Sequence, residues 1–227
     1  MFETGRLGPG LFGFAAVLLT LGVAAGSGGA VAHAQSGLLV FPGMEIHQAN
    51  HRCTMGFVDT AARVGYTAGH CHGDGPVTDR DGHLIGTLTK FQDNTPDGAT
   101  IDTSHPITDW ETISLADGVE ANDILPGGRE LILDPGAVVQ LGQPVCHFGV
   151  VTGETCGSVN SVNNGWFTMG NGIVSQKGDS GGPVYAISPD DRALLVGVFN
   201  STWGSSPAAV AWSSAGPDGA VLRNTAG

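Results

Sequence analysis

The stretch Gly178-Asp179-Ser180-Gly181-Gly182-Pro183 carries the strongest signal in this sequence. A serine hydroxyl is a poor nucleophile until a base removes its proton. It must also lie where backbone N–H groups can meet the oxyanion of a tetrahedral intermediate. Glycine permits that close approach, because it accepts backbone angles that other residues resist. The same residues also suit a simple tight turn between strands, so a nucleophilic Ser180 needs support from elsewhere in the chain.

A second motif, Tyr66-Thr67-Ala68-Gly69-His70-Cys71, places a histidine at the end of a short apolar run. Histidine is the usual base for an activated serine, because its pKa lies near neutral. We interpret the other seven histidines as ordinary surface or core residues. Two separate motifs that point to one mechanism support each other.

The third member of such a site is a buried carboxylate that orients the imidazole. Asp97 precedes Gly98-Ala99-Thr100-Ile101, so it can stand at the start of a strand, and it is the favoured candidate. Asp102 is the alternative, although Thr103-Ser104-His105-Pro106 after it is typical of a turn.

The four cysteines are even in number, which in an exported chain favours two disulfides. Of the three possible pairings, the spacing favours the local ones, Cys53 with Cys71 and Cys146 with Cys156. A metal site is the competing interpretation of His70-Cys71-His72, but a C-x-x-C pair is missing. We therefore expect no metal and no other cofactor.

The rest of the chain predicts β-structure, with 37 glycines and short apolar or alternating runs bounded by turn residues. The predicted strands are Thr54–Val58, Arg63–Thr67, His83–Thr89, Glu130–Leu133, Ala137–Leu141, Val159–Val162, Gly165–Met169, Pro183–Ile187 and Ala193–Phe199. The polar segment Ala116–Gly128 resembles a connection between two β units.

The first residues predict export. Leu11–Ala25 is apolar but short for a membrane span, and Ala32-His33-Ala34 fits a signal-peptide cleavage site. An uncleaved anchor remains the alternative. The net charge of −12 disfavours binding to nucleic acid and to anionic lipid. We expect a secreted protein without stable membrane insertion.

In combination, the motifs resemble the chymotrypsin-fold serine proteases, above all the secreted bacterial branch with the streptogrisins and α-lytic protease. The 27-residue interval from His70 to Asp97 suits that branch. The matching pieces stand in the family's order: Cys53–Phe57, Thr67–Cys71, Asp97–Ile101, Val145-Cys146, Thr152-Gly153, Cys156-Gly157 and Gly178–Pro183.

The resemblance implies an all-β fold of two packed six-stranded antiparallel barrels, with the active site in the cleft between them. After a signal peptide of residues 1–34, the first barrel would span 35–120 and the second 121–227. The first would supply His70 and Asp97, and the second Ser180. The backbone N–H groups of Gly178 and Ser180 would form the oxyanion hole. Asp179 usually makes a buried ion pair in this family, and its partner here is open.

Departures from the family pattern concern the substrate pocket. Gln176 replaces a disulfide cysteine, and Asn200-Ser201-Thr202 replaces the usual Ser, then Trp or Gly, then Gly. A threonine at 202, in place of that glycine, would narrow the primary specificity pocket or alter the pairing with the substrate backbone. Val174 stands where pocket polarity is often set, so we expect small or apolar residues before the cleaved bond. Val174, Asn200 and Thr202 are the candidate substrate-binding residues.

The leading hypothesis is a monomeric, secreted serine endopeptidase acting on protein or peptide substrates. A pseudoprotease that uses the same barrels as an exported binding module is the second hypothesis. A third is an esterase or other acyl-transfer enzyme with the same triad.

Overall fold

The computed structural model describes residues 37–96, 102–134 and 136–214. The expected signal peptide, residues 1–34, lies outside this part of the chain. Within the described ranges, no helix has the length and apolar character needed to cross a membrane.

The described residues form short strands joined by turns, because runs rich in β-branched and aromatic residues alternate with glycines at positive φ. The elements are β1 Leu39–Val40, β2 Glu45–Gln48, β3 His51–Thr54, β4 Phe57–Asp59, β5 Val64–Thr67, η1 Gly69–Cys71, β6 Val77–Thr78, β7 Leu84–Asp93, β8 Asp109–Leu115, β9 Glu120–Ala121, β10 Leu131–Ile132, β11 Pro144–Gly149, β12 Gly153–Val162, β13 Trp166–Gly170, β14 Pro183–Ile187, β15 Ala193–Trp203, β16 Ser206–Ala211 and η2 Trp212–Ser214.

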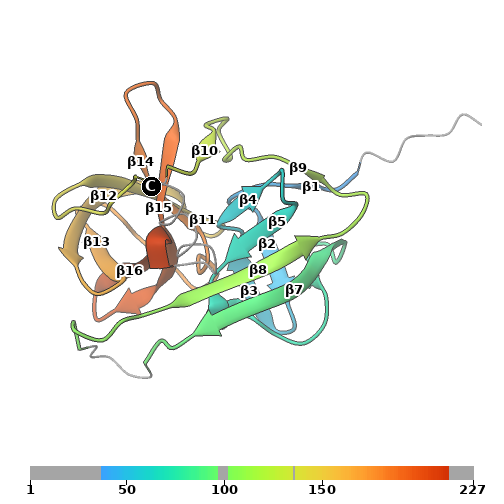
Figure 1. The fold of residues 1–227 in the computed structure, drawn as a ribbon, viewed down its shortest axis with the longest axis horizontal. Helices are drawn as coiled ribbons and strands as arrows, with labels where there is room; N and C mark the ends of the chain where they lie inside the picture. The colour runs from blue at the N-terminus through green and yellow to red at the C-terminus, as the bar shows by residue number, and fades with distance from the viewer. Residues whose placement is uncertain (1–36, 97–101, 135, 215–227) are drawn as a thin grey trace, which may run out of the picture. The chain divides into compact units, whose positions relative to one another are not determined.

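The strands build two seven-stranded sheets, which lie beside each other in Figure 1, and a two-stranded sheet of β1 and β9. The first has the order β3-β2-β6-β7-β8-β5-β4 and curls into a half-barrel. The second has the order β10-β15-β14-β11-β12-β13-β16, and its β15–β16 pairing closes a barrel of six strands. The expected all-β architecture of two barrels is confirmed.

The apolar faces of the two large sheets are buried in three clusters. One cluster includes the fully buried Ile46, Met55, Ile85 and Ile113 of the first half of the chain, together with Trp166 of β13. The other two are built around Phe167 and Leu131, and the one around Leu131 also includes Phe57 of β4. Burying such a side chain is worth roughly 1.5–3 kcal/mol, so these clusters hold the two sheets as rigid supports for the loops between them.

Two expectations about local structure need correction. Ala137–Leu141 forms no strand, because the segment is a loop that turns back through the Gly142 N–H to Val159. β8 was not predicted at all, although it is a central strand of the first sheet.

The segment Ala116–Gly128 connects the two sheets but contains β9, which pairs in parallel with β1. The expected domain boundary between residues 120 and 121 falls inside that short strand.

Candidate active site

His70 lies in η1, a 3-10 helix of one turn that follows β5. The turn packs against the end of β7, where a Cβ on Gly69 would lie 2.1 Å from the Gln92 carbonyl oxygen. Only glycine allows this approach. Cys71 fixes the other end of the turn through its disulfide to Cys53 in β3. The imidazole is therefore held on both sides, and it is 32% exposed.

The partner of His70 is Asp109, the first residue of β8. Its carboxylate is fully buried, and Oδ2 lies 2.9 Å from His70 Nδ1. Oδ1 accepts the backbone N–H of His70 at 2.8 Å. The two bonds fix both the ring and the backbone of His70 relative to the first sheet.

The sequence did not predict this role for Asp109. Asp97, the favoured acid, lies outside the described residues. Asp102 is exposed and accepts the backbone N–H and the hydroxyl of Ser104, as in an ordinary turn. The sequence offered one signal for Asp109: it is an acidic residue directly before Trp110–Leu115. In that run, all residues but Ser114 are buried.

The protonation of His70 reflects two opposing effects. Burial lowers the pKa of the imidazole, while the hydrogen bond and the negative charge of Asp109 raise it. The second pair of effects prevails, so the pKa of His70 lies above its ordinary value. Such a base is tuned to hold a proton that it takes from a hydroxyl.

A β-bulge brings the second barrel to Asp109. The register of β15 against β16 shifts between Phe199 and Ser201, so Asn200 is the additional residue. A bulge redirects a side chain, and here Asn200 is buried beside Phe199. Its Nδ2 donates to Asp109 Oδ2 at 2.5 Å and to Thr95 Oγ1 at 3.0 Å. The Asn200 side chain is thus occupied by Asp109 and Thr95, and its backbone carbonyl faces Ser180.

Ser180 lies in the turn before β14, and its Oγ donates a long hydrogen bond of 3.5 Å to the Asn200 carbonyl. No hydrogen bond joins this hydroxyl to His70 in the described structure. Catalytic hydrogen bonds are often long or misaligned before substrate binds. Proton transfer to His70 requires the hydroxyl to turn from Asn200 toward the imidazole.

Strand β3 of the first sheet holds the turn around Ser180 from the other side. Arg52 Nη2 donates to the Lys177 carbonyl at 3.1 Å, and Thr54 Oγ1 donates to the Gly178 carbonyl at 2.9 Å. The Thr54 N–H donates to the Ser180 carbonyl at 2.8 Å. Alternate residues of a strand share a face, so Arg52 and Thr54 reach the turn together.

The C=O and N–H of one trans peptide point in opposite directions, so the Arg52 bond to the Lys177 carbonyl orients the Gly178 N–H. In the same way, the Gly182 N–H, which donates to the Asp179 carbonyl at 3.0 Å, orients the Ser180 N–H. Gly178 has φ +111°. Among the described residues, neither the Gly178 N–H nor the Ser180 N–H donates to another group. By contrast, the N–H groups of Asp179, Gly181 and Gly182 all have carbonyl partners. Two unpaired donors beside a serine hydroxyl are what an oxyanion hole requires.

Asp179 is fully buried behind this turn. Its carboxylate accepts the N–H groups of Val151, Thr152 and Gln176 and the Thr152 hydroxyl, at 2.7–3.2 Å. No lysine or arginine forms an ion pair with it among the described residues. The structure thus resolves the open question of its partner: backbone donors stabilise this charge.

A second histidine lies near Asp179. His147 in β11 is fully buried, its ring packs on Phe199 at 4.6 Å, and Nδ1 lies 3.4 Å from the Pro183 carbonyl oxygen. Burial lowers the pKa of His147 to about 4, against the opposing charge of Asp179. This ring is therefore neutral at neutral pH.

The candidate substrate-binding residues lie near the turn. Ser175 Oγ and Thr202 Oγ1 form a hydrogen bond of 2.8 Å, which ties the segment before Ser180 to the end of β15. Thr155 Oγ1 contacts the backbone N–H and carbonyl of Val174 at 3.3 Å, and the Val174 side chain is 55% exposed.

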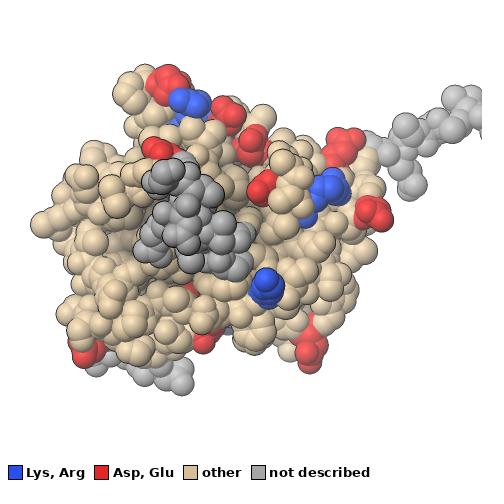
Figure 2. Space-filling model, viewed as in Figure 1, with Lys and Arg blue, Asp and Glu red and all other residues tan. Residues whose placement is uncertain are grey.

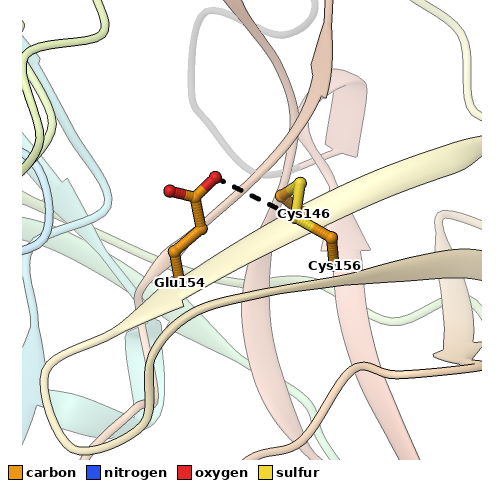
Figure 3. Close-up of side chains that lie close together, drawn as sticks. All are labelled: Cys146, Glu154 and Cys156. Carbon is orange, nitrogen blue, oxygen red and sulfur yellow. Dashed lines mark hydrogen bonds between the residues drawn. A yellow bond between two sulfur atoms is a disulfide. The ribbon is translucent and has the colours of Figure 1, made fainter.

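Both expected disulfides are present, Cys53–Cys71 and Cys146–Cys156. Glu154 lies beside the second (Figure 3), with Oε1 3.9 Å from Cys156 Sγ. The two sulfur atoms are bonded to each other, so they offer no thiolate to a metal, and Glu154 pairs with Arg129 at 3.1 Å. A second group, Asp79, Asp81 and His83, is a turn in which Asp79 accepts two backbone N–H groups and bonds the His83 ring.

Comparisons with known proteins place this chain among relatives. No family model matches it. It is 56% identical over 209 residues to the uncharacterized proteins MT1863 and Rv1815 of Mycobacterium tuberculosis, and the match covers 92% of each chain.

Solved structures with the same fold include a glutamic acid-specific serine protease with a histidine triad in substrate binding. It is 21% identical, with a TM-score of 0.56, and the match covers 82% of this chain and 97% of that one. The chymotrypsin of Cellulomonas bogoriensis is 20% identical with the same TM-score, covering 83% and 96%. An inactivated protease paralogue of the scabies mite is 13% identical with a TM-score of 0.50, covering 80% and 92%. The fold is therefore chymotrypsin-like, and the residues of the site must decide the activity.

Proposed function

Since this chain belongs to one family with the two mycobacterial proteins and has the chymotrypsin-like fold, we propose that it is a serine endopeptidase. In this proposal Ser180 is the nucleophile, His70 the general base and Asp109 the carboxylate that orients His70. Asp109 takes the role for which the sequence favoured Asp97. The N–H groups of Gly178 and Ser180 form the oxyanion hole.

One observation carries the proposal: a buried carboxylate bonds Nδ1 of a half-buried histidine beside a serine whose turn has two unpaired N–H donors. A structural histidine needs no unpaired donors next to it. The neighbouring N–H groups of Asp179, Gly181 and Gly182 all have acceptors, so two unpaired donors beside a hydroxyl favour a binding site for an oxygen atom.

In the mechanism, His70 Nε2 takes the proton of Ser180 Oγ while Oγ bonds the carbonyl carbon of the substrate. The negative charge on the carbonyl oxygen meets the two N–H donors of the turn. Asp109 keeps the Nδ1 proton of His70 in place and stabilises the imidazolium. His70 then protonates the leaving amine, and water releases the acyl group by the same steps in reverse.

Four further features belong to this proposal. The protein is exported after cleavage near residue 34, it acts as a monomer, and it cleaves protein or peptide chains. The Ser175–Thr202 hydrogen bond joins the segment before Ser180 to the end of β15, and the apolar Val174 side chain beside it is 55% exposed. These features support the expected preference for small or apolar residues before the cleaved bond.

The decisive test is labelling of purified residues 35–227 by a fluorophosphonate probe, which reacts with activated serines whatever the cleavage specificity. We expect labelling of the unmutated protein and none of Ser180→Ala. His70→Ala should label at least 1,000-fold more slowly, since triad members act as a unit (about 10³-fold or more). Equal labelling of the Ser180→Ala protein, or none of a folded unmutated protein, would contradict the proposal.

A binding module without catalysis is the second candidate. One observation favours it: Ser180 Oγ bonds the Asn200 carbonyl rather than His70. If the folded, disulfide-intact protein resists the probe at every pH between 5 and 9, this candidate replaces the first.

A further inference from the structure

We infer that Arg52, with Lys177, forms a carboxylate-binding subsite for the part of the substrate that leaves during acylation. This inference rests on the proposed peptidase function and names the class of substrate: chains with a carboxylate one or two residues beyond the cleaved bond. An aspartate or glutamate side chain can supply that group, as can the C-terminal carboxylate of a short leaving peptide.

The Arg52 guanidinium has a defined position at the catalytic turn. Nη2 bonds the Lys177 carbonyl at 3.1 Å. Its Nε and Nη2 lie 2.9 and 3.0 Å from the point where a Cβ on Gly178 would stand. The guanidinium thus covers Gly178, whose N–H is one of the two unpaired donors. A ligand that reaches this guanidinium also reaches the reacting bond.

Arg52 keeps most of its hydrogen-bonding capacity free. A guanidinium has five N–H donors in a planar fork that matches a carboxylate. The described contacts of Arg52 use one of them. Within the described ranges neither Arg52 nor Lys177 forms an ion pair.

This free charge contrasts with the other described arginines. Arg63 donates to two backbone carbonyls. The other three pair with carboxylates: Arg80 with Asp81, Arg129 with Glu154 and Asp191, and Arg192 with Asp190. Acidic groups are scattered over the face shown in Figure 2, and basic groups there are few. In a chain of net charge −12, Arg52 is the one described arginine that has neither a carboxylate partner nor a second hydrogen bond.

Asp179, the carboxylate closest to Lys177 along the chain, forms no ion pair with Arg52 or Lys177. Asp179 is fully buried, and its oxygens are occupied by donors from Val151, Thr152 and Gln176. Lys177 is exposed and adds a second positive charge next to Gly178. Two positive side chains thus lie next to Gly178, and within the described ranges no carboxylate pairs with either of them.

The side of Ser180 on which Arg52 lies identifies the part of the substrate that it meets. Ser180 Oγ contacts the Asn200 carbonyl in β15, the strand whose end at Thr202 the proposed function assigns to the residue before the cleaved bond. The Ser180 carbonyl contacts Thr54 on the other side. Arg52 belongs to the same strand and face as Thr54, so it lies toward the leaving amine.

The experiment measures kcat/KM for matched peptides on the purified protein. Cleavage sites are first located by mass spectrometry with an unbiased peptide library. Peptides that carry Asp or Asn at the first or second position beyond the cleaved bond are then compared. A second pair carries a free or an amidated C-terminus at the same distance. We expect about a tenfold preference for the carboxylate form of at least one pair, as for a charge-assisted hydrogen bond, and a smaller preference in high salt.

Variants assign the preference to residues. Arg52→Gln and Lys177→Gln should each lower the Asp/Asn ratio toward one, and Arg52→Lys should keep part of it. Arg192→Gln, which removes the same charge from the β14–β15 turn, should keep the full ratio. Any general damage to the turn affects both peptides of a pair equally and cancels in the ratio.

The outcomes separate this inference from the proposed function. Probe labelling and cleavage with ratios near one for every pair would overturn the carboxylate subsite and leave the peptidase standing. A ratio that Arg52→Gln and Lys177→Gln leave unchanged would also overturn it. Absence of both labelling and cleavage would overturn the two together.

Discussion

The protein contains two aspartate–histidine neighbourhoods that differ in every physical respect. Asp109 and His70 are hydrogen-bonded through Nδ1, and His70 is partly exposed. Asp179 and His147 are both fully buried, and no hydrogen bond joins them. The pKa of His70 is raised, while burial lowers that of His147 to about 4.

The difference shows what a carboxylate does for a nearby imidazole. Asp109 spends one oxygen on the ring and the other on the backbone of His70, so its charge acts on that histidine. The oxygens of Asp179 accept backbone N–H groups and the Thr152 hydroxyl. No hydrogen bond joins Asp179 to His147, so burial outweighs the charge of Asp179 and lowers the pKa of His147. A direct hydrogen bond to a carboxylate raises the pKa of a histidine, as for His70. Burial without such a bond leaves the imidazole neutral, as for His147.

Removing the charge of Asp109 should have the largest effect on this contrast. Asp109→Asn keeps the shape but loses the acceptor that fixes the His70 tautomer, so we expect the labelling rate at pH 7 to fall about 10³–10⁴-fold. The pKa of His70 should also fall, because the charge that raised it is gone. The pH dependence of fluorophosphonate labelling measures both effects.

Asp102→Asn is the matched control, since it removes an exposed carboxylate from the neighbouring turn. It should label at the unmutated rate. A large loss in Asp102→Asn together with normal labelling in Asp109→Asn would reverse the assignment of the orienting acid.

Glu111 allows a second test, because it lies in β8 two residues after Asp109 and is fully buried. Its carboxyl oxygens lack hydrogen bonds of ordinary geometry, although the Gln48 amide is near. Burial, aided by the charge of Asp109, raises the pKa of Glu111 from 4.5 to about 8. The folded state thus holds a proton that the unfolded chain releases, so stability is lost as the pH rises from 4.5 to 8.

Glu111→Gln should remove this pH dependence. The free energy of unfolding of the unmutated protein, relative to the variant, should fall by roughly 1.4 kcal/mol per pH unit within that window. Urea unfolding with intact disulfides measures it. Glu120→Gln, at an exposed position in β9, should retain the unmutated pH dependence, and the same behaviour in Glu111→Gln would show that Glu111 ionises freely.

His147 gives the smallest expected effect, because its pKa window is narrower. The unfolded imidazole takes up a proton near pH 6.5, whereas the folded one resists it until about pH 4. Stability is therefore complete above pH 6.5 and lost as the pH falls toward 4, again by roughly 1.4 kcal/mol per unit.

His147→Gln should abolish this acid-side loss in urea unfolding measured between pH 4 and 6.5. His51→Gln changes an exposed histidine and should leave it unchanged. If His147→Gln loses stability toward acid as steeply as the unmutated protein, burial does not lower the pKa of His147, and the contrast with His70 fails.

The sequence predicted those parts of the site that are determined by residues close together along the chain. Ser180 and His70 lie in short motifs with glycines at the required bends, and the disulfides join cysteines close in sequence. Asp109 could not be found that way, because it stands 39 residues from His70. Its strand also contains Glu111, a residue type depleted in strands, whose burial only the fold determines. The bulge at Asn200 depends on register with β16, which single-sequence patterns do not encode.

The Cys53–Cys71 disulfide has a consequence for the redox state in which the protein can work. Cys53 stands between Arg52 and Thr54, which hold the turn around Ser180, and Cys71 directly follows His70. One covalent bond therefore ties His70 to the strand that holds the turn around Ser180. Both cysteines lie in the buried cluster of the first sheet, so a thiol reductant would remove this link from within the core. An oxidising compartment is therefore the setting in which the link can form.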